Sequence, residues 1–550
     1  MCGIWALLGR YSDKTNIHAC VKQLEPRGPE FTDIRYLDSK HVVLGFTRLA
    51  INGLTAAGNQ PFEHNGNFLV CNGEIYNYKE LAARWELPLH AGSSDCEVIP
   101  LLSERLCGAG AGAAAAAGMT ELCRTLDGVF AFVFVAADSV FVARDPYGVR
   151  PLYQAMTAET AEGSIVWSSE IKGFPAGCTQ IEAFPPGTWR QYSFEGVKLA
   201  EHRYHTVPNV KLAAFRDRGV ARAALRSSLL WAVQKRLLSD RPIGALLSGG
   251  LDSSLIAAIA ARELAKTNTK LHTFSIGMPG STDLKYAQVV ANKIGSIHHN
   301  VIVSPQDFLD AIPKVVHDIE SYDITSVRAS VGNWLIGKFI KENTDIKVVF
   351  NGDGSDEIGG GYIYSYAAPS DEEFEGESER LLEEIHTYDV LRSDRSMAAH
   401  GLEARTPFLD KNVVATWRAL PTAFRRPVKG GQMEKAILRE AFADDDYLPT
   451  EVLWRKKEAF SDGVSSKEDS WYVRCGEEAK RTGITLEYVQ TQTRDWHNPP
   501  PTTEAFLYRR MFEEHYGTEA ARIIPHMWMP RWVAGANDPS ARTLKELYAE

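Results

Sequence analysis

The pattern of apolar and polar positions changes near residue 200, and it predicts different structures on the two sides. Before that point, short runs of β-branched and aromatic residues alternate with turn-forming residues, which is typical of strands. The first 200 residues are therefore predicted to be rich in β-structure. The runs are residues 42–46, 68–71, 129–135 and 140–143.

Beyond residue 222, longer stretches with helical periodicity alternate with short apolar runs. Residues 223–238 and 254–265 have the period of helices, whereas residues 243–247 and 347–350 are strand-like. This alternation predicts a parallel sheet flanked by helices, so the chain as a whole is expected to have an α/β fold.

The change of pattern also predicts the domain organisation. We place the boundary between Gly196 and Arg218, with a first domain over residues 1–205, a second over residues 206–520 and a C-terminal tail over residues 521–550. A chain of 550 residues has room for several cores, since a domain commonly has about 100–200 residues.

Two stretches carry no predicted chemistry. Residues 107–118 are rich in Ala and Gly and favour a loop insertion or a short helix. Residues 371–384 are strongly acidic and are expected to form a solvated helix face.

Composition narrows the class of protein. Hydrophobic residues make up 44% and charged residues 24% of the chain, which is typical of folded, soluble proteins. The net charge is −10 and the basic residues are scattered. Because they form no basic stripe that could bind a phosphate backbone, a nucleic-acid partner is not expected. No run approaches the roughly 20 apolar residues that a membrane span needs, and the start of the chain does not have the pattern of a signal peptide. The eight cysteines have no metal-ligand spacing, which predicts reduced thiols and a cytoplasmic location.

Cys2 is the first candidate for catalysis. Removal of Met1 would place its thiol beside a free α-amino group, whose reference pKa is about 7.7–8.0. An amine with this pKa is a suitable general base at neutral pH, as for N-terminal threonine nucleophiles. Because many proteins have a small residue at position 2, Cys2 alone is weak evidence.

Further motifs in the first domain strengthen this interpretation. They are Arg27-Gly28-Pro29, residues 48–52, residues 72–77, residues 94–97 and Arg144-Asp145 followed by residues 148–153. Together with Cys2, this set resembles the class II glutamine amidotransferases. The resemblance implies an N-terminal-nucleophile fold, an α+β domain in which a β-sandwich lies between helices.

The resemblance also implies a role for each matching residue. Cys2 is the nucleophile, Arg48 clamps the α-carboxylate of glutamine, and Glu74 with Asp95 binds its α-amino end. The Asn72 amide and the Gly73 backbone N–H would hold the oxyanion, a contribution of about 3–4 kcal/mol per donor. The implied glutamine-binding set is Arg48, Leu49, Ala50, Ile51, Asn52, Asn72, Gly73, Glu74 and Asp95.

Residues 248–254, Ser-Gly-Gly-Leu-Asp-Ser-Ser, follow a strand-like run and precede a helical one. Adjacent glycines permit positive φ and bring backbone N–H groups to a helix N-terminus, where an anion is stabilised. A carboxylate here would repel phosphate unless a cation lies between them, so Asp252 predicts Mg²⁺. The run resembles the ATP-pyrophosphatase loop. Its predicted phosphate-binding residues are Ser248, Gly249, Gly250, Asp252, Ser253 and Ser254.

Motifs farther along the chain indicate one family. Residues 275–277, 322–328, 351–357, 403–410 and 454–458 have the order and content of the glutamine-hydrolysing asparagine synthetases. The resemblance extends nearly to residue 516. It implies that the second domain has a parallel sheet like that of adenine-nucleotide hydrolases, with ATP as co-substrate.

The same resemblance assigns residues in the second domain. Leu246 and Ile276 would border the adenosine, with Asn351 and Gly352 close to the nucleotide. Thr325 and Arg328 would bind aspartate. Asp252 and Asp356 would bind Mg²⁺, and Lys457 would offset charge that develops during the reaction.

One departure from the family concerns residues 351–357, Asn-Gly-Asp-Gly-Ser-Asp-Glu, where the family commonly has Ser-Gly-Glu-Gly-Ser-Asp-Glu. Asp353 is one methylene shorter than the usual glutamate, which guides the β-aspartyl-AMP intermediate or takes a proton from ammonia. A displacement of about 1 Å can cost on the order of 10²-fold in rate. We therefore expect either a compensating backbone or altered activity.

The reaction that the resemblance implies has small-molecule substrates only: glutamine, aspartate and ATP. Glutamine gives glutamate and ammonia, ATP adenylates aspartate, and ammonia converts β-aspartyl-AMP to asparagine, with AMP and pyrophosphate as further products. An internal ammonia tunnel and a homodimer are implied as well. Two alternatives remain open: a synthetase with another acceptor carboxylate, and a weakly active binding or regulatory protein that keeps the fold.

Overall fold

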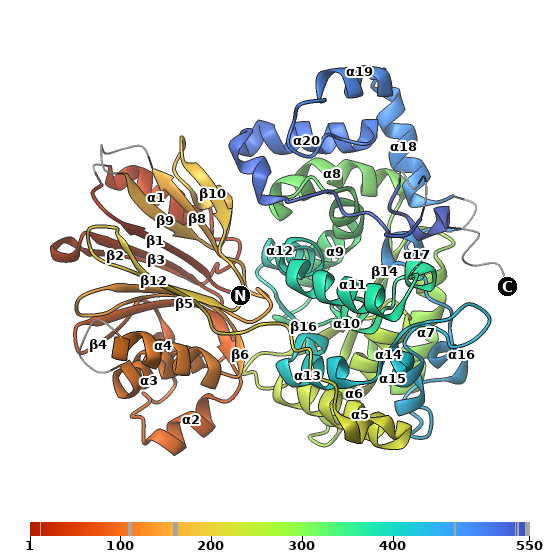
Figure 1. The fold of residues 1–550 in the computed structure, drawn as a ribbon, viewed down its shortest axis with the longest axis horizontal. Coiled ribbons are helices and arrows are strands. Elements are labelled where there is room, and N and C mark those ends of the chain that lie inside the picture. Colours follow the sequence, from red (N-terminus) through yellow and green to blue (C-terminus); the bar gives the residue numbers. More distant parts are fainter. Residues whose placement is uncertain are drawn as a thin grey trace.

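The computed structural model describes residues 1–11, 13–107, 113–157, 163–466, 469–533, 535 and 538–544. The chain forms two lobes that lie side by side, and the N-terminus lies between them (Figure 1). Within the described ranges, no helix is both long and apolar enough to cross a membrane.

The first lobe contains two six-stranded sheets, in which all strand pairs are antiparallel. The strand orders are β10-β8-β9-β1-β3-β2 and β12-β11-β7-β6-β5-β4. The strands of the first sheet are β1 (Gly3–Leu8), β2 (Phe31–Leu37), β3 (Val42–Arg48), β8 (Tyr153–Thr157), β9 (Ser164–Ser168) and β10 (Thr179–Ala183). Those of the second are β4 (Phe62–His64), β5 (Asn67–Ile75), β6 (Gly128–Val135), β7 (Val140–Arg144), β11 (Thr188–Tyr192) and β12 (Lys198–Arg203).

Apolar side chains on the facing sides of the two sheets pack together and form the core of a β-sandwich. Ile4 and Leu44 of the first sheet and Val70 and Val133 of the second belong to one buried cluster between the sheets. The opposite faces are covered by helices, so that the inner strands β1, β3, β6 and β7 are buried on both sides, whereas the edge strands β2 and β12 are partly exposed. Helix α1 (Lys14–Lys22) covers the first sheet, and helices α2 (Tyr78–Trp85), α3 (Val98–Cys107) and α4 (Ala113–Thr125) cover the second.

The second lobe is built on a five-stranded parallel sheet with the order β15-β14-β13-β16-β17. Helices lie on both faces, as the alternation of helical and strand-like runs predicted. Helices α5, α6 and α7 contribute to the cluster on one face, and α8, α9 and α12 to the cluster on the other. The strands are β13 (Ile243–Leu246), β14 (His272–Gly277), β15 (Ile297–Ile302), β16 (Val348–Phe350) and β17 (Glu403–Arg405).

The helices of this lobe are, in chain order, α5 (Arg218–Lys235), α6 (Leu251–Ala265), α7 (Thr282–Ile294), α8 (Pro305–Ile319), α9 (Ile324–Asn343), α10 (Ser355–Gly359), α11 (Asp371–Glu384) and α12 (Asp389–Ala398). They are followed by α13 (Lys411–Ala419), α14 (Thr422–Arg425), α15 (Ala436–Ala441), α16 (Thr450–Leu453), α17 (Phe460–Gly463), α18 (Trp471–Arg481), α19 (Leu486–Gln492) and α20 (Thr503–Tyr516). The α/β class is thus confirmed for the whole chain.

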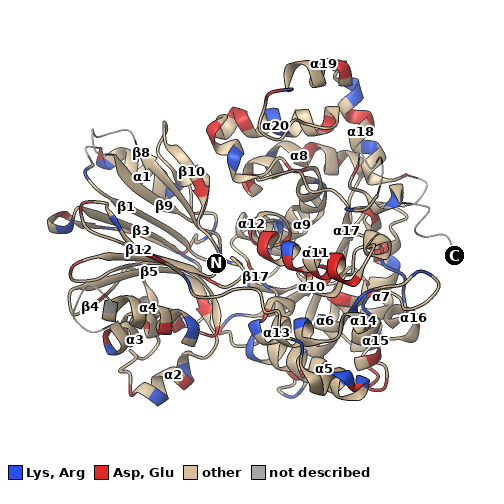
Figure 2. Cartoon of the chain, in the orientation of Figure 1, with Lys and Arg blue, Asp and Glu red and all other residues tan. Residues whose placement is uncertain are grey.

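The acidic stretch at residues 371–384 is a helix, as expected, but its acidic face is not simply solvated. Figure 2 shows acidic residues along α11. Glu375 binds Arg418 at 2.8 Å and Arg425 at 2.9 Å, and Glu377 is buried. The prediction holds for the exposed residues Asp371–Glu373 but not for Glu375, because basic residues far along the chain neutralise its carboxylate. Of the Ala/Gly-rich stretch at residues 107–118, residues 108–112 lie outside the described part, and residues 113–118 begin α4.

Helix α12 contacts both lobes. Asp394 accepts hydrogen bonds from Arg27 of the first lobe at 2.8 and 3.3 Å, and Arg395 forms an ion pair with Glu170 of the first lobe at 2.9 Å. All four side chains are buried. On the same helix, Arg392 points to the second lobe's cavity, as described below.

Candidate functional site

A small cavity of about 20 Å³ lies in the first lobe, where β1, β3 and β5 end close together. Cys2 stands directly before β1, and Arg48 is the last residue of β3. Of the predicted glutamine-binding set, all members except Asn72 line this cavity, which is also bordered by Met1 and Glu403. The fold therefore brings Cys2 and the predicted glutamine-binding residues, as far along the chain as Asp95, to one cavity.

Cys2 is held by its backbone. Its N–H donates to Asn72 Oδ1 at 3.0 Å, and its carbonyl accepts from Arg27 Nε at 2.9 Å. The thiol lies 3.8 Å from the Leu49 carbonyl oxygen. Burial raises the pKa of this thiol, whereas the N-terminal ammonium and Arg48 oppose the rise. A buried thiol with a raised pKa needs a nearby base to become a nucleophile.

The side-chain amide of Asn72 has an N–H donor without a hydrogen-bond partner in the described part of the chain. This nitrogen, Nδ2, is buried. An unpaired buried donor is costly, of the order of 1–3 kcal/mol, and such groups often serve a bound ligand. The amide is therefore placed as an oxyanion-hole donor would be, next to the Cys2 nitrogen that binds its other end.

The acidic side of this cavity is held in place by polar contacts. Asp95 accepts a hydrogen bond from the Ile75 N–H at 2.6 Å, and burial raises its pKa to about 6. Glu74 accepts from Asn52 at 2.6 Å and forms an ion pair with Arg405 at 3.3 Å. Burial raises the pKa of Glu74 as well.

The Arg48 guanidinium donates hydrogen bonds to the loop at residues 53–59, beside the cavity. The acceptors are the Thr55 carbonyl and Asn59 Oδ1, each at 2.7 Å, and the guanidinium also contacts the Gly53 carbonyl. In this arrangement Arg48 fixes the loop, and its role as a clamp for a carboxylate stays a prediction.

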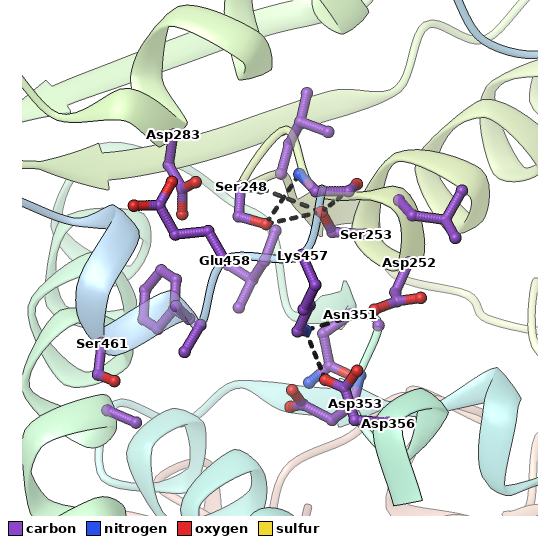
Figure 3. A pocket seen from close by; sticks show the side chains of 18 of the residues that line it. Ser248, Asp252, Ser253, Asp283, Asn351, Asp353, Asp356, Lys457, Glu458 and Ser461 are labelled. Atoms are coloured by element: carbon purple, nitrogen blue, oxygen red, sulfur yellow. Dashed lines mark hydrogen bonds and ion pairs between the residues drawn. The ribbon is translucent and has the colours of Figure 1, made fainter. Parts of the chain in front are cut away.

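A larger cavity, of about 200 Å³, lies at the carboxyl ends of strands β13, β14 and β16 (Figure 3). This is where open α/β sheets bind ligands. Ser248, Gly250, Asp252 and Ser253 line it, between the end of β13 and the start of α6. Leu246 at the end of β13, Ile276 of β14, and Asn351 and Gly352 after β16 line it too.

The phosphate-binding loop has the geometry that its glycines predicted. Gly249 has φ +72°, and a Cβ there would lie 2.4 Å from the Ala287 backbone nitrogen, so only glycine fits. Gly250 caps the N-terminus of α6. The Ser253 hydroxyl is 3.0 Å from the Ser248 hydroxyl, which draws the two sides of the loop together. Gly249 and Ser254 are not among the residues that line the cavity, and Ser254 is fully buried beneath it.

Two lysines stand between the two predicted metal ligands. Lys435 Nζ is 2.7 Å from Asp252 and 2.5 Å from Asp356, and Lys457 Nζ is 2.6 Å from Asp356. Burial acts to raise the Asp356 pKa, but Lys435 and Lys457 outweigh it and hold the pKa well below its usual range. Figure 3 shows Lys457, Asp252 and Asp356 pointing toward one another.

The sequence interpretation missed Lys435. It is buried and has the left-handed backbone angle φ 54°, which is uncommon for a residue with a side chain. No motif near it in the sequence indicates a role, and its partner Asp252 lies 183 positions away. Only the fold reveals that it belongs to the cavity.

Asp353 lies in the cavity wall and is held by Arg392 of α12, whose NH2 donates to Asp353 Oδ1 at 2.9 Å. Arg392 also contacts Asp389, which in turn accepts from the Gly354 N–H at 2.9 Å. Burial raises the pKa of Asp353 to about 6 although Arg392 opposes the rise. Asp353 Oδ2 has no partner within the described part of the chain.

The two residues predicted to bind aspartate are placed differently. Thr325, in the first turn of α9, lines the cavity, and its hydroxyl is buried without a partner in the described ranges. Arg328 is not among the lining residues. It forms ion pairs with Glu504 at 2.6 Å and Asp538 at 2.8 Å. The structure thus brings Thr325 to the cavity and holds Arg328 in contacts behind it.

Comparisons with known proteins agree with this arrangement. The family profile described as "Glutamine amidotransferase domain" matches residues 1–217, and that described as "Asparagine synthase" matches residues 224–376 and 366–534. Two relatives, both named asparagine synthetase [glutamine-hydrolyzing], come from Cricetulus griseus and Homo sapiens. They are 41% and 40% identical over 584 residues, and each alignment covers 99% of this chain and 98% of the relative.

The chain belongs to the glutamine-hydrolysing asparagine synthetase family. The relative of the same name from Gallus gallus is 39% identical over 590 residues, with 99% of both chains covered. Among solved structures, the glutamine phosphoribosylpyrophosphate amidotransferase from B. subtilis is 17% identical with a TM-score of 0.33, over 55% of this chain and 81% of that one. Apart from Glu403, the residues that line the cavity around Cys2 lie within the match to the glutamine amidotransferase domain, and the residues that line the larger cavity belong to the part matched by the asparagine synthase profile.

Proposed function

We propose that the chain makes asparagine by dividing one reaction between its two cavities. The first hydrolyses glutamine to glutamate and ammonia. In the second, ATP adenylates aspartate with release of pyrophosphate, and ammonia then attacks β-aspartyl-AMP to give asparagine and AMP. One observation carries the proposal: a thiol beside an unpaired amide donor and a phosphate loop beside an acid–lysine cluster occur in one chain.

In the glutaminase cavity, Cys2 is the nucleophile. Met1 stands before it, with its α-amino group 3.4 Å from Glu403, so removal of Met1 is the step that would give Cys2 its own amine. That amine would take the thiol proton, and the thiolate would attack the carboxamide carbon of glutamine. Asn72 Nδ2 and the Gly73 N–H would stabilise the oxyanion. Ammonia leaves from the tetrahedral intermediate, and water then hydrolyses the thioester to glutamate.

In the synthetase cavity, the loop at residues 248–253 receives the phosphates at the N-terminus of α6. Lys435 and Lys457 lie where the charge of departing pyrophosphate develops, so they would stabilise it. Leu246, Ile276, Asn351 and Gly352 surround the nucleoside, and Thr325 lies where aspartate would bind. For Arg328, the ion pairs with Glu504 and Asp538 indicate a supporting role for the aspartate-binding wall.

Asp252 and Asp356 fit Mg²⁺ by their chemistry, since their carboxylates border the phosphate loop. No group of three or more acidic, His or Cys ligands exists in the described ranges, which suits a metal held by one or two carboxylates together with substrate phosphates. Mg²⁺ bound there would neutralise phosphate charge. Without it, the two lysines neutralise these carboxylates.

Asp353 would accept a proton from the ammonia that attacks β-aspartyl-AMP, through its unpartnered Oδ2. Because its pKa is raised to about 6, the carboxylate is mostly protonated below that pH and ionised above it. We expect the rate of asparagine formation to rise as the pH increases through about 6 and to level off above 7. The measurement is kcat against pH, with ammonium adjusted so that free ammonia is constant. Asp353→Asn should remove the inflection, and an unchanged inflection in this variant would assign it to another group.

The basic test of the function uses the unsubstituted protein. With aspartate, ATP and Mg²⁺, either glutamine or ammonium should support release of pyrophosphate and formation of asparagine in equal amounts. Pyrophosphate release with another acid in place of aspartate would indicate a different acceptor. Absence of pyrophosphate under all conditions would favour the binding or regulatory alternative. Intact mass of the purified chain checks the loss of Met1.

Three further parts of the proposal concern the chain as a whole. We propose the domain limits 1–205 and 206–520 with the tail at 521–550. The family matches, at residues 1–217 and 224–534, also divide the chain into two parts, and α5 begins between them at Arg218. The eight cysteines all lie in the described ranges and form no disulfide there, which supports a reducing, cytoplasmic location. The homodimer remains a prediction, which sedimentation of the purified protein can test.

A further inference from the structure

The C-terminal segment at residues 538–544 packs against the segment that carries Lys457. In Figure 1 the dark-blue end of the chain passes beside α17. Ser540 donates to Asp462 Oδ1 of α17 at 2.7 Å, and Asp538 binds Arg328 of α9 through two hydrogen bonds of 2.9 and 2.8 Å. The Ser540 and Leu544 side chains are buried. This part of the tail is therefore docked onto the synthetase lobe.

Arg542 is the most extensively hydrogen-bonded side chain of residues 538–544. Its guanidinium donates to the Ser466 carbonyl at 2.7 Å, to Ser470 Oγ at 2.6 Å and to Glu458 Oε1 at 2.9 Å. The Ser465 carbonyl accepts a further hydrogen bond at 3.2 Å. An exposed ion pair contributes little, but this side chain is only 14% exposed. Both terminal nitrogens of its guanidinium donate hydrogen bonds, which fixes their geometry.

Glu458 continues the contacts toward the phosphate loop. Its second oxygen accepts from Thr282 Oγ1 at 2.8 Å and from Arg455 at 3.0 Å. Arg455 in turn donates to the Gly249 carbonyl of the phosphate loop at 3.1 Å. Three side chains, Arg542, Glu458 and Arg455, thus connect the tail to the loop, and Lys457 lies within the same short stretch of chain.

We propose that Arg542 is a positioning residue of the synthetase reaction, acting through Glu458 to hold the Lys457 segment and Arg455 over the phosphate loop. The inference rests on the proposed function, because the effect is expected only in the ATP-dependent half. Nothing in the sequence around Arg542 indicates this role. It follows from contacts between residues 84 positions apart.

The test compares Arg542→Gln and Arg542→Lys with a matched control, Arg531→Gln. Arg531 lies in the same tail but binds Glu377 of α11 at 3.0 Å, away from the cavity.

The readout is ammonium-supported, aspartate-dependent pyrophosphate release. Arg542→Gln should lower kcat/KM for ATP by roughly 10- to 100-fold, because a catalytic group displaced by about 1 Å loses that much. Arg542→Lys should have a kcat/KM for ATP between those of Arg542→Gln and the unsubstituted protein, since a single ammonium nitrogen cannot reproduce the planar guanidinium with its two terminal nitrogens. Arg531→Gln should match the unsubstituted protein.

Two measurements separate positioning from loss of fold. Glutamine hydrolysis, which takes place in the other lobe, should stay within about twofold in Arg542→Gln, and so should KM for aspartate. In the double variant with Glu458→Gln, the loss should be no greater than in Glu458→Gln alone, because both residues act through one connection.

Full synthetase activity of Arg542→Gln would overturn the inference. So would additive losses in the double variant, or parallel loss of both half-reactions in both Arg542 variants. Failure of the proposed function is distinct, because then the unsubstituted protein itself would release no pyrophosphate with aspartate and ammonium.

Discussion

Replacement of Cys2 by alanine is expected to abolish asparagine formation from glutamine while leaving formation from ammonium within about twofold of the unsubstituted rate. Cys2 lines the described cavity, its backbone N–H donates to Asn72 Oδ1 at 3.0 Å, and Arg48 acts to lower the pKa of its thiol. Without it no thioester forms, so glutamine hydrolysis should fall by roughly 10⁴-fold or more. Ammonium enters the reaction after this step and should bypass the loss.

The measurement is asparagine produced with each nitrogen source at saturating ATP and aspartate. Cys20→Ala is the matched control, since Cys20 is a buried cysteine of α1 that does not line the cavity. Equal loss with both nitrogen sources would show that the substitution damages the fold. Retained glutamine-dependent synthesis would mean that another group is the nucleophile.

Replacement of Lys457 by methionine is expected to lower pyrophosphate release by roughly 10²- to 10³-fold with either nitrogen source. Burial lowers the pKa of this lysine, but Asp356 and Asp252 raise it by more, so that it lies above its ordinary value and the ammonium stays charged. Methionine keeps much of the length but removes the charge opposite the phosphates. The two carboxylates would then be left with Lys435 as the lysine that both contact.

Glutamine hydrolysis by Lys457→Met should be unchanged, which provides an internal check on folding. Lys266→Met is the control, because Lys266 pairs with Glu263 at 2.7 Å on the surface and is 61% exposed. The two half-reactions are measured separately, as glutamate release and as pyrophosphate release. Normal pyrophosphate release in Lys457→Met would leave Lys435 as the principal cation of the site.

Local patterns carried the successful predictions. The strands and the two-glycine phosphate loop were visible in the sequence because alternation, helical period and glycine are local properties. The residues around Cys2 were found through their motifs, and the structure places them around one cavity. Their individual roles stay predictions until variants are measured.

Contacts between distant parts of the chain could not be read from these patterns. Lys435 reaches Asp252 across 183 positions, and its left-handed backbone has no sequence signal. Arg328 fits a motif, yet its guanidinium binds Glu504 and Asp538, which are 176 and 210 positions away. The acidic helix α11 was predicted to face solvent because nothing nearby in sequence indicates that Arg418 and Arg425 pack against it.

Helix α12 has a consequence for the exchange of parts between relatives. Within four successive residues it contacts both halves of the enzyme: Arg392 holds Asp353, and Asp394 and Arg395 form buried ion pairs with Arg27 and Glu170. A chimaera joined at the linker near residue 206 would combine this helix with a glutaminase lobe from another parent. Any mismatch would leave a buried charge without its counter-ion, which costs several kcal/mol. The natural unit for such grafting is therefore the first lobe together with residues 389–398.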